Sequence, residues 1–413
     1  MIWDNGLFCS LAETLSPNFK KTYYFSEYAG PFPRDAETAI GQGLPGVTRV
    51  FDPWTEVLSE GKEDLLVVFP DCFYGGLQEF LRSLGYRVWG SGTGERIELD
   101  RLFAHRLFEQ LGVPTPKWEH ITGTAKLKDY LKANPGVYVK TRYGRIRGSG
   151  ETHKVESYDL AEPWFDEMEK NLGRRKAMTE FIVEHPTPDA MEISSERFLV
   201  DRQFPGVSMF SMEVKGDGAV SKVLATERFP TQITEVDRVL IAEPWADGYR
   251  QQWTIETRVD KTGKPWPIDP CTRFGRPSWG TVSANTTNLA DILWSGAEGL
   301  CVDPEPVEEY VAELMIECPL VATRGCVLDV PSSVAPYVFL SDSYIQAGKR
   351  CVAAMDIQNI GSVVGIGSSL DAAIDQCKKR SEKIKADGIE MHVEAFDKAT
   401  ENWESLSDYG VDV

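Results

Sequence analysis

The order of strand-like and helix-like segments changes once along the chain, and this change restricts the possible folds most strongly. Residues 64–69 (DLLVVF) are a short apolar, β-branched run, residues 75–85 repeat apolar positions at helical spacing, and residues 86–90 (YRVWG) are strand-like again. This strand–helix–strand rhythm predicts a parallel sheet in an α/β domain of about a hundred residues. After Pro135, strand-like runs alternate with turn sequences such as KGDG and DKTGK, which predicts antiparallel hairpins. The chain is therefore expected to combine α/β and α+β regions in several domains.

Helical spacing is clearest in the segment ELDRLFAHRLFEQL, whose apolar residues share one face and which ends at Gly112 before two prolines. Further helices are predicted at 157–172, 287–299 and 371–384. A chain of 413 residues is longer than one simple core usually allows, so two or three domains are expected. The last thirteen residues are acidic and are expected to be loose.

The composition excludes several classes of function. The net charge of −19, from 63 acids and 44 bases, opposes binding to duplex nucleic acid and to anionic membranes. No apolar run approaches the ~18 residues of a membrane span, and the N-terminus lacks the pattern of a signal peptide, so a cytoplasmic protein is expected. The 8 cysteines include no C-x-x-C pair, so most of the thiols are expected to be small buried hydrophobic groups. The 5 histidines show no metal-ligand spacing, so a histidine metal site is not expected.

A strand that ends in a lysine leads into a loop rich in glycine and arginine. The stretch GVYVKTRYGRIRGSGET (136–152) places Lys140 at the strand end, ahead of three glycines and three arginines. Glycines let backbone N–H groups approach a phosphate closely, and a lysine supplies a point charge. The stretch matches neither the Walker A nor the dinucleotide fingerprint, and from composition alone a basic hairpin is the simpler interpretation.

Two carboxylates flank a predicted hairpin turn. Glu256 precedes the DKTGK turn and Asp269 follows it, thirteen positions later. On a hairpin this spacing puts both acids on adjacent antiparallel strands, where they would suit Mg²⁺. Taken alone, two solvated acids on a hairpin remain the simpler interpretation.

In chain order, these parts together resemble the ATP-grasp ligases, and most closely phosphoribosylamine–glycine ligase (glycinamide ribonucleotide synthetase), with low and patchy identity. The resemblance implies an ATP-grasp fold with an N-terminal α/β domain and a small C-terminal domain that resembles the last domain of the synthetase. It divides the chain into an N-terminal substrate domain (1–98), an ATP-grasp domain (99–300) with a flexible lid (about 118–182), a C-terminal domain (301–400) and an acidic tail (401–413).

The resemblance also implies roles for individual residues in nucleotide binding. Arg101 stands where the first ATP-binding lysine is usual, and Lys140 matches the second. The segment MTEFIVE resembles the adenine hinge, with Glu180 facing the exocyclic amine and the backbone reading the ring edge. The remaining matches are the hinge residues Phe181 and Val183, the ribose-binding acid Glu192, and the lid residues Arg147, Gly148, Ser149 and Gly150.

The stretch IDPCTRFGRP resembles the metal and phosphate segment of the family. The resemblance implies Asp269 and Glu256 as metal ligands and Arg273, together with Lys140, as the catalytic cations. Cys271 occupies the place of a metal-binding asparagine, and a thiol is a poor Mg²⁺ ligand, so one ion is expected to be weakly held, replaced by a softer metal, or absent. In addition, Arg276 replaces an acid, which argues against simple glycinamide synthesis.

The resemblance implies an ADP-forming ligase that uses ATP with Mg²⁺, or Mn²⁺, and acts through an acylphosphate. The ligase would join an amino acid or another carboxylate to an amine on a small, nucleotide-like substrate. Residues 4–6 and 70–76 are expected to shape the acceptor pocket, and the arginines nearby suggest a phosphorylated or carboxylated acceptor. A homodimer is compatible with the family, and no membrane partner is expected. The alternatives are an ATP-binding protein without turnover and an unrelated enzyme with a Cys271 thiol nucleophile, which lacks a histidine base nearby in sequence.

Overall fold

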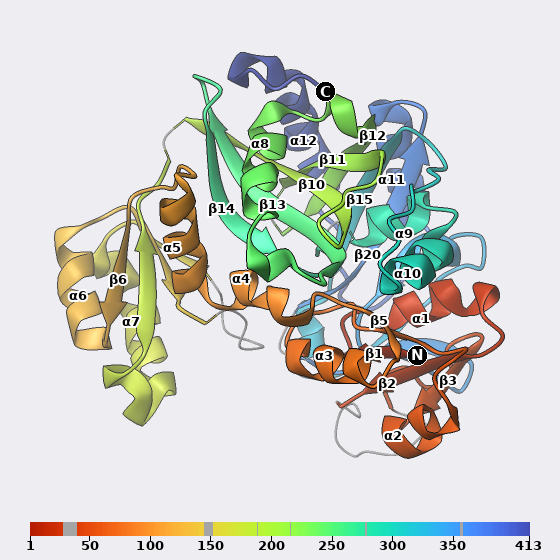
Figure 1. The fold of residues 1–413 in the computed structure, drawn as a ribbon. Helices are drawn as coiled ribbons and strands as arrows, with labels where there is room; N and C mark the ends of the chain where they lie inside the picture. Colours follow the sequence, from red (N-terminus) through yellow and green to blue (C-terminus); the bar gives the residue numbers. More distant parts are fainter. Residues whose placement is uncertain (28–38, 144–151, 188, 215, 277–278, 356–357) are drawn as a thin grey trace.

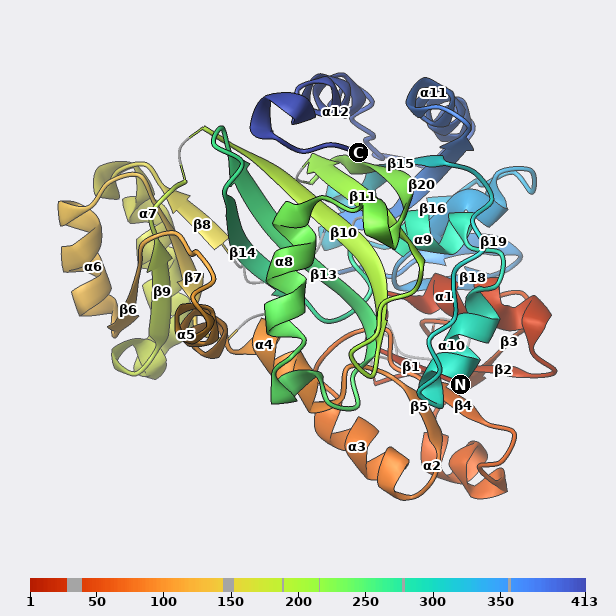
Figure 2. The same ribbon diagram turned by 45° about the horizontal axis from the view of Figure 1, so that its top comes forward.

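The computed structural model describes residues 1–27, 39–143, 152–187, 189–214, 216–276, 279–355 and 358–413. Figure 1 shows three parts: an N-terminal domain, the segment predicted as the lid (called the lid below), which stands to one side, and a central sheet that continues into the C-terminal region. In Figure 2, α5 (Arg101–Leu111) lies beside the lid sheet, on the side toward α4 (Arg96–Leu99). Among the described residues, no helix is both long enough and apolar enough to cross a membrane.

The N-terminal domain contains a five-stranded parallel sheet in the order β3-β2-β1-β4-β5. From β1 the chain continues to β2 and β3 on one side of the sheet, and then returns to β4 and β5 on the other side, so the strand order reverses between β1 and β4. Helix α1 (Cys9–Leu15) follows β1 and helix α3 (Gly75–Ser83) follows β4. The carboxyl edge at such a reversal is the usual ligand site of an open parallel sheet. The predicted strand–helix–strand unit is confirmed. The strands are β1 (Ile2–Asp4), β2 (Thr22–Ser26), β3 (Val47–Val50), β4 (Leu66–Val68) and β5 (Arg87–Trp89), and short helices α2 (Pro53–Glu56) and α4 (Arg96–Leu99) complete the domain.

The lid is a four-stranded antiparallel sheet in the order β6-β9-β7-β8, covered on one face by two helices. Apolar side chains of alternate strand positions pack against these helices, and Phe181 and Val183 belong to this core. The opposite face therefore carries the polar alternate positions, among them Lys140. The elements are β6 (Trp118–Thr122), α6 (Thr124–Ala133), β7 (Val137–Thr141), β8 (Thr152–Val155), α7 (Tyr158–Leu172) and β9 (Glu180–Glu184).

The central sheet has eight strands in the order β14-β13-β10-β11-β12-β15-β20-β17. Strand β12 pairs with β15, so the region after residue 300 continues the same sheet rather than starting a separate one. One face is apolar and packs on α8 (Thr231–Leu240) and α12 (Ala395–Glu404). The strands are β10 (Ala190–Val200), β11 (Val207–Val214), β12 (Gly218–Ala225), β13 (Arg250–Asp260), β14 (Pro265–Cys271), β15 (Tyr310–Glu317), β17 (Val338–Leu340) and β20 (Asn359–Gly367).

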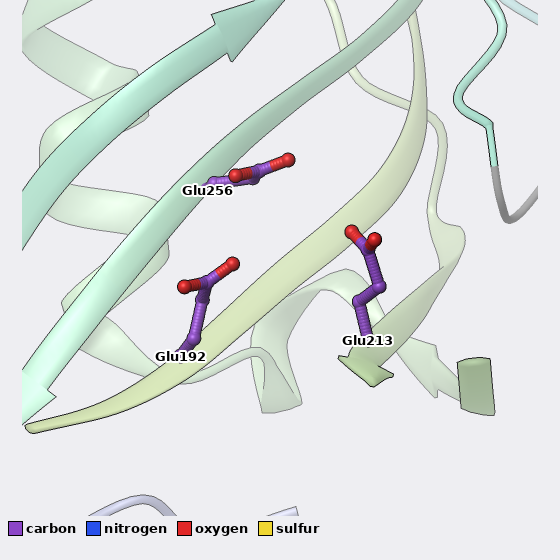
Figure 3. A group of neighbouring side chains, drawn as sticks. All are labelled: Glu192, Glu213 and Glu256. Atoms are coloured by element: carbon purple, nitrogen blue, oxygen red, sulfur yellow. The ribbon is translucent and has the colours of Figure 1, made fainter. Parts of the chain in front are cut away.

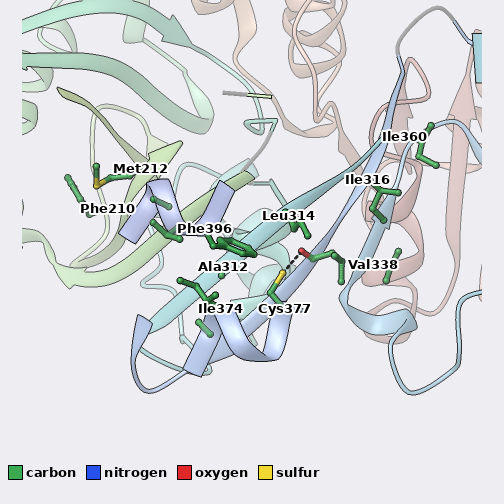
Figure 4. Packing of buried hydrophobic residues seen from close by; sticks show 14 of the residues in the cluster. Phe210, Met212, Ala312, Leu314, Ile316, Val338, Ile360, Ile374, Cys377 and Phe396 are labelled. Atoms are coloured by element: carbon green, nitrogen blue, oxygen red, sulfur yellow. Dashed lines mark hydrogen bonds between the residues drawn. The ribbon is translucent and has the colours of Figure 1, made fainter. Parts of the chain in front are cut away.

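The C-terminal core forms where α11 (Leu370–Ser381) packs on β20 and β15. Figure 4 shows this packing, in which the Cys377 thiol donates to the carbonyl of Val363 (3.3 Å). Six cysteines are buried, as expected for thiols that act as small apolar groups, and Cys271 and Cys301 are half-buried. The remaining elements are α9 (Trp279–Asn285), α10 (Leu289–Ala297) and a three-stranded sheet of β16 (Cys326–Leu328), β19 (Lys349–Val352) and β18 (Ser343–Gln346).

The last thirteen residues are ordered, so the expectation of a loose tail is wrong. Helix α12 runs to Glu404 and a 3₁₀ turn follows at 406–409. Leu406 and Val411 are 3% and 1% exposed and join the core under the central sheet, and the Trp403 ring packs on Phe210 (5.7 Å between centroids). Of the five apolar residues in this stretch, two are buried and the other three are half-buried and pack against the same core, which offsets its acidic composition.

Candidate functional site

The polar face of the central sheet carries carboxylates on four adjacent strands. Asp269 on β14 lies directly opposite Glu256 on β13, as the thirteen-residue spacing predicts. Glu192 on β10 and Glu213 on β11 continue this row, because alternate positions of each strand share a face. Figure 3 shows the carboxylates of Glu192, Glu213 and Glu256 pointing toward one another.

Within the described part of the chain, these three glutamates are close enough together to hold a cation. One ligand oxygen from each lies within 4.8 Å of the others. Arg258, the register partner of Glu192, contacts the Glu192 carboxylate at 3.4 Å and offsets part of the negative charge. Carboxylate oxygens grouped in this way are the ligands that hard divalent cations prefer.

Lys140 joins the lid to this acidic face. Its Nζ lies 3.2 Å from Glu184 Oε1 on β9 and 3.6 Å from Asp269 Oδ2 on β14. Glu184 also contacts His105 Nε2 on α5 at 2.9 Å, and the Lys140 and Glu184 side chains are each 6% exposed. The contacts therefore bring the lid sheet, α5 and the β13–β14 hairpin together around one buried ammonium group.

The charges around Lys140 determine which protonation state each group holds. Burial acts to lower the pKa of Lys140, but the carboxylates of Asp269 and Glu184 outweigh it and the pKa is raised overall. Burial acts to raise the pKa of Glu184, but the Lys140 charge and the His105 contact outweigh it and the pKa is lowered. Both groups are therefore charged near neutral pH, and each needs the other to remain so in a buried position.

Arg101 lies beside this cluster at the start of α5. It is 6% exposed, its Nη1 donates to the carbonyl of Thr141 (3.0 Å), and its backbone N–H donates to the carbonyl of Arg142 (2.9 Å). Its charge acts to lower the pKa of Lys140. The two cations are therefore near enough for their charges to interact.

Glu180 is held by Arg142 and His120 in this structure. Arg142 contacts Asp100 through Nε and Nη2 (2.9 and 3.0 Å) and both oxygens of Glu180 through Nη1 (2.9 and 3.0 Å). His120 Nε2 lies 2.6 Å from the second Glu180 oxygen. This network ties the end of α4 to the polar face of the lid sheet.

The other hinge residues lie in the middle of a sheet. Phe181 and Val183 belong to β9, which pairs with β6 on one side and with β7 on the other. The lid residues Arg147, Gly148, Ser149 and Gly150 lie outside the described residues.

Arg273 is turned toward the N-terminal domain. Its Nε lies 2.9 Å from Glu98 Oε1 and 3.6 Å from Asp71 Oδ1. The Cys271 thiol donates to the carbonyl of Arg273 (3.7 Å), and Arg276 binds the side-chain oxygen of Asn359 (2.8 Å). Arg273 therefore joins the end of the β13–β14 hairpin to the carboxyl edge of the parallel sheet.

Acids also gather at that carboxyl edge. Asp4 ends β1, Asp71 follows β4, and both are almost fully buried. Asp342, 1% exposed, donates its N–H to the carbonyl of Gly6 (2.6 Å). Gly6 has a φ of +103°, and a Cβ there would lie 2.1 Å from Asp342 Oδ1, so only glycine fits. The expected acceptor segments, 4–6 and 70–76, thus meet at one place.

The buried acid Asp4 should make the stability of the protein depend on pH. Burial, the largest cause, raises its pKa from 3.8 to about 7. Between these values the folded protein holds a proton that the unfolded chain releases, so the free energy of unfolding falls as the pH rises. We expect Asp4→Asn to gain stability relative to the wild type from pH 4 to pH 7, by at most about 4 kcal/mol.

Comparing the two proteins at each pH by urea unfolding isolates this effect from other buried groups, such as the Met1 amino group, whose pKa burial lowers to about 5. A difference in unfolding free energy that stays constant over this range would contradict the prediction.

Several residues of the site are absent from the sequence prediction. His105 follows Arg101 by four positions on a helix and therefore shares its face, and Glu184 follows Glu180 by four positions on a strand and shares its face. These two spacings could therefore have placed His105 and Glu184 beside the predicted site residues from the sequence alone. Glu213 has no such signal, because its place depends on the pairing of β10 with β11.

Comparison with solved structures shows several that share this fold over nearly the whole chain, whereas no family model and no curated protein matches. Phosphoribosylamine–glycine ligase from Thermotoga maritima has a TM-score of 0.70 at 15% identity, covering 94% of this chain and 98% of its own. The biotin carboxylase domain of 2-oxoglutarate carboxylase from Hydrogenobacter thermophilus, solved with MgADP and bicarbonate, has a TM-score of 0.67 at 12% identity, covering 100% and 99%. The L-amino acid ligase from Bacillus licheniformis has a TM-score of 0.62 at 15% identity, covering 93% and 98%.

All three of these neighbours are ATP-grasp proteins. Because these structures cover 93% or more of this chain, they confirm the predicted fold class. The chain has the ATP-grasp fold, with an α/β domain before it and a C-terminal region that extends its sheet.

Proposed function

We propose that the protein is an ATP-dependent ligase that joins a carboxylate to an amine and forms ADP. The observation that carries the proposal is the contact between Lys140 of the lid and Asp269 of the acidic face, 3.6 Å from Nζ to Oδ2. This contact sets a cation that can neutralise a phosphate beside acids that can hold a metal ion. The ligases among the structural neighbours, and the MgADP bound to one of these neighbours, support the same function.

The residues of the acidic face fit the Mg²⁺ ion that the fold implies. Their donor set is made of carboxylate oxygens only, and three of the carboxylates already converge. Glu256 and Asp269 are the proposed ligands, with Glu192 and Glu213 within reach as further ligands or as partners of the ribose. The ion would supply positive charge to the phosphate oxygens of ATP, and Mn²⁺ shares this donor preference.

The nucleotide would lie between the lid and the acidic face. Lys140 and Arg101 are proposed to neutralise the phosphates, and the lid residues Arg147, Gly148, Ser149 and Gly150 are proposed to cover them. Glu180, Phe181 and Val183 stay the proposed adenine contacts. In the structure described here the β9 backbone is paired on both sides, so reading the ring edge would require part of that pairing to open.

The proposed reaction has two steps. A carboxylate oxygen of the substrate attacks the γ-phosphorus of ATP, the bond to the β-phosphate oxygen breaks, and ADP leaves an acylphosphate behind. The amine nitrogen then attacks the acyl carbon, inorganic phosphate leaves with the bonding electrons, and the amine proton passes to phosphate or solvent. Lys140 would neutralise charge in the first step and Arg273, positioned by Glu98 and Asp71, in the second. No thiol takes part, so Cys271 needs no catalytic role.

A second function is favoured by one observation. Arg273 and Glu180, both proposed to meet ligands, already have partners within the protein at about hydrogen-bond distance. An ATP-binding protein without turnover would keep such contacts permanently, whereas a ligase would exchange them for substrate.

ADP release distinguishes the two functions. The protein is incubated with ATP, Mg²⁺ and pooled amino acids, other carboxylates and amines, and ADP is measured by a coupled assay. We expect ADP formation that needs both an acid and an amine. Tight ATP binding with no ADP formed across all pools would support the binding protein instead.

A further inference from the structure

We propose that the amine substrate of this ligase binds as an unphosphorylated cation at the carboxyl edge of the parallel sheet, beside Asp4, Asp71 and Asp342. Its role as substrate rests on the proposed function, whereas its chemistry follows from the geometry of this edge. Phosphorylated ligands of open α/β sheets bind at the turns after the central strands, where backbone N–H groups of a helix start are free. In this protein both of those turns already hold a carboxylate.

The first turn, between β1 and α1, is filled by Asp4. Its Oδ2 accepts hydrogen bonds from the backbone N–H of Gly6 (3.0 Å) and of Phe8 (2.9 Å), which are the donors at the start of α1. The hydroxyl of Tyr24 donates to the same oxygen (2.8 Å). A phosphate at this turn would have to displace the carboxylate or lie against it, and like charges repel.

The second turn, between β4 and α3, is filled by Glu95. Its carboxylate accepts from the backbone N–H groups of Phe73, Tyr74 and Gly75 at the start of α3. A Cβ on Gly75 would lie 2.8 Å from Glu95 Oε1, which shows how closely the carboxylate fits the turn. The sheet therefore supplies its own anions at both positions where a phosphate group would bind.

What remains at this edge is an unused acceptor among further acids. Asp4 is 0% exposed, and its Oδ1 has no hydrogen-bond partner among the described residues. Asp71 acts electrostatically on Asp4, and Asp342 packs against Gly6 of the same turn. A buried carboxylate oxygen without a donor is costly, and an ammonium group, with three donors and a positive charge, would satisfy it.

The spacing of these acids favours an organic cation over a metal ion. Within the part of the chain that the structure describes, only Glu192, Glu213 and Glu256 bring three ligand atoms within 4.8 Å of one another. The oxygens of Asp4, Asp71 and Asp342 are spread more widely. An amine carried on a carbon or sugar framework, which can reach separate acceptors, suits that arrangement better than a single ion.

The edge also lies next to the proposed chemistry. The backbone N–H of Phe274 donates to the carbonyl of Pro70 (3.1 Å), which connects the segment after the β13–β14 hairpin to the segment after β4. Arg273, four positions after Asp269, contacts Asp71. The two arginines that suggested a phosphorylated acceptor already have contacts within the protein. Arg273 forms an ion pair with Glu98, and Arg276 donates to the side-chain oxygen of Asn359.

Matched pairs of amines test the proposal by isothermal titration of the full chain at pH 8, with and without AMP-PNP and Mg²⁺. The probes are ethanolamine against O-phosphoethanolamine, and glucosamine against glucosamine 6-phosphate. We expect at least one unphosphorylated amine to bind and its phosphorylated counterpart to bind more weakly. The Asp4→Asn variant should bind that amine with an affinity lower by about 10-fold or more. Asp387→Asn, an exposed acid paired with Arg324, is the matched control and should leave amine affinity unchanged.

Tighter binding of either phosphorylated probe would overturn the proposal, as would equal amine affinity in the wild type and in Asp4→Asn. Failure of both unphosphorylated amines to bind under either condition would also overturn it. Unfolding curves of Asp4→Asn show whether lost binding reflects lost structure. ATP binding is titrated separately. If the protein binds the amine but does not bind ATP, the result would contradict the ligase and leave the amine site supported.

Discussion

Asp269→Asn is expected to lower ATP turnover by about 100- to 1000-fold, because a metal ion contributes several kcal/mol to charge stabilisation during phosphoryl transfer. Asparagine keeps the size of the side chain but removes the negative charge that faces Lys140 and Glu256. The proposed adenine contacts lie on the lid, so the affinity for ATP without metal should change little. The measurement is steady-state ADP formation together with equilibrium binding of ATP in EDTA.

Asp260→Asn provides the matched control on the same hairpin. The Asp260 carboxylate lies at the turn end of the hairpin, where it accepts from the backbone of Thr262 and Lys264, so its neutralisation should leave ADP formation near the wild-type rate. Full activity in Asp269→Asn would remove Asp269 from the metal site. Equal losses in both variants would point to damage of the hairpin instead.

Lys140→Met is expected to destabilise the fold by about 3–5 kcal/mol and to abolish turnover, because it leaves the buried Glu184 carboxylate without its cation. Glu184 is 6% exposed, so water cannot replace the lost ammonium, whereas Asp269 at 34% is partly solvated. The free energy of unfolding from urea titration measures the first effect, and ADP formation measures the second.

The double variant Lys140→Met with Glu184→Gln separates structure from chemistry. Removing the orphaned charge should restore most of the lost stability, whereas turnover should stay absent because the phosphate has lost its cation. If the double variant recovers turnover along with stability, Lys140 has a structural role only.

The parts of the site that depend on short sequence separations could be predicted. The DKTGK turn fixes the hairpin register, so the pairing of Glu256 with Asp269 follows from their spacing. Likewise, an apolar run that ends in Lys140 shows where the strand stops. The parallel sheet and its carboxyl edge follow from the strand–helix–strand order in the first hundred residues or so.

The parts that depend on packing between domains could not be predicted. Lys140 and Asp269 are 129 positions apart, and their contact exists because the lid sheet lies against the central sheet through α5. The contacts of Arg273 with Glu98 and Asp71 similarly require the hairpin to dock on the N-terminal domain. The C-terminal segment was expected to be loose because four of its thirteen residues are acidic, whereas the burial of its apolar residues depends on packing against the distant central sheet.

Transfer of oxygen from a carboxylate to phosphate tests the ligase most directly. Acids labelled with ¹⁸O in their carboxyl groups are incubated with the protein, ATP, Mg²⁺ and the amine pool, and the phosphate released is analysed by ³¹P NMR. If an acylphosphate forms, one labelled oxygen stays with the phosphate, so the account predicts an isotope-shifted phosphate signal that requires Lys140 and Asp269. Unlabelled phosphate alongside ADP, or no ADP at all, would contradict the proposed ligase.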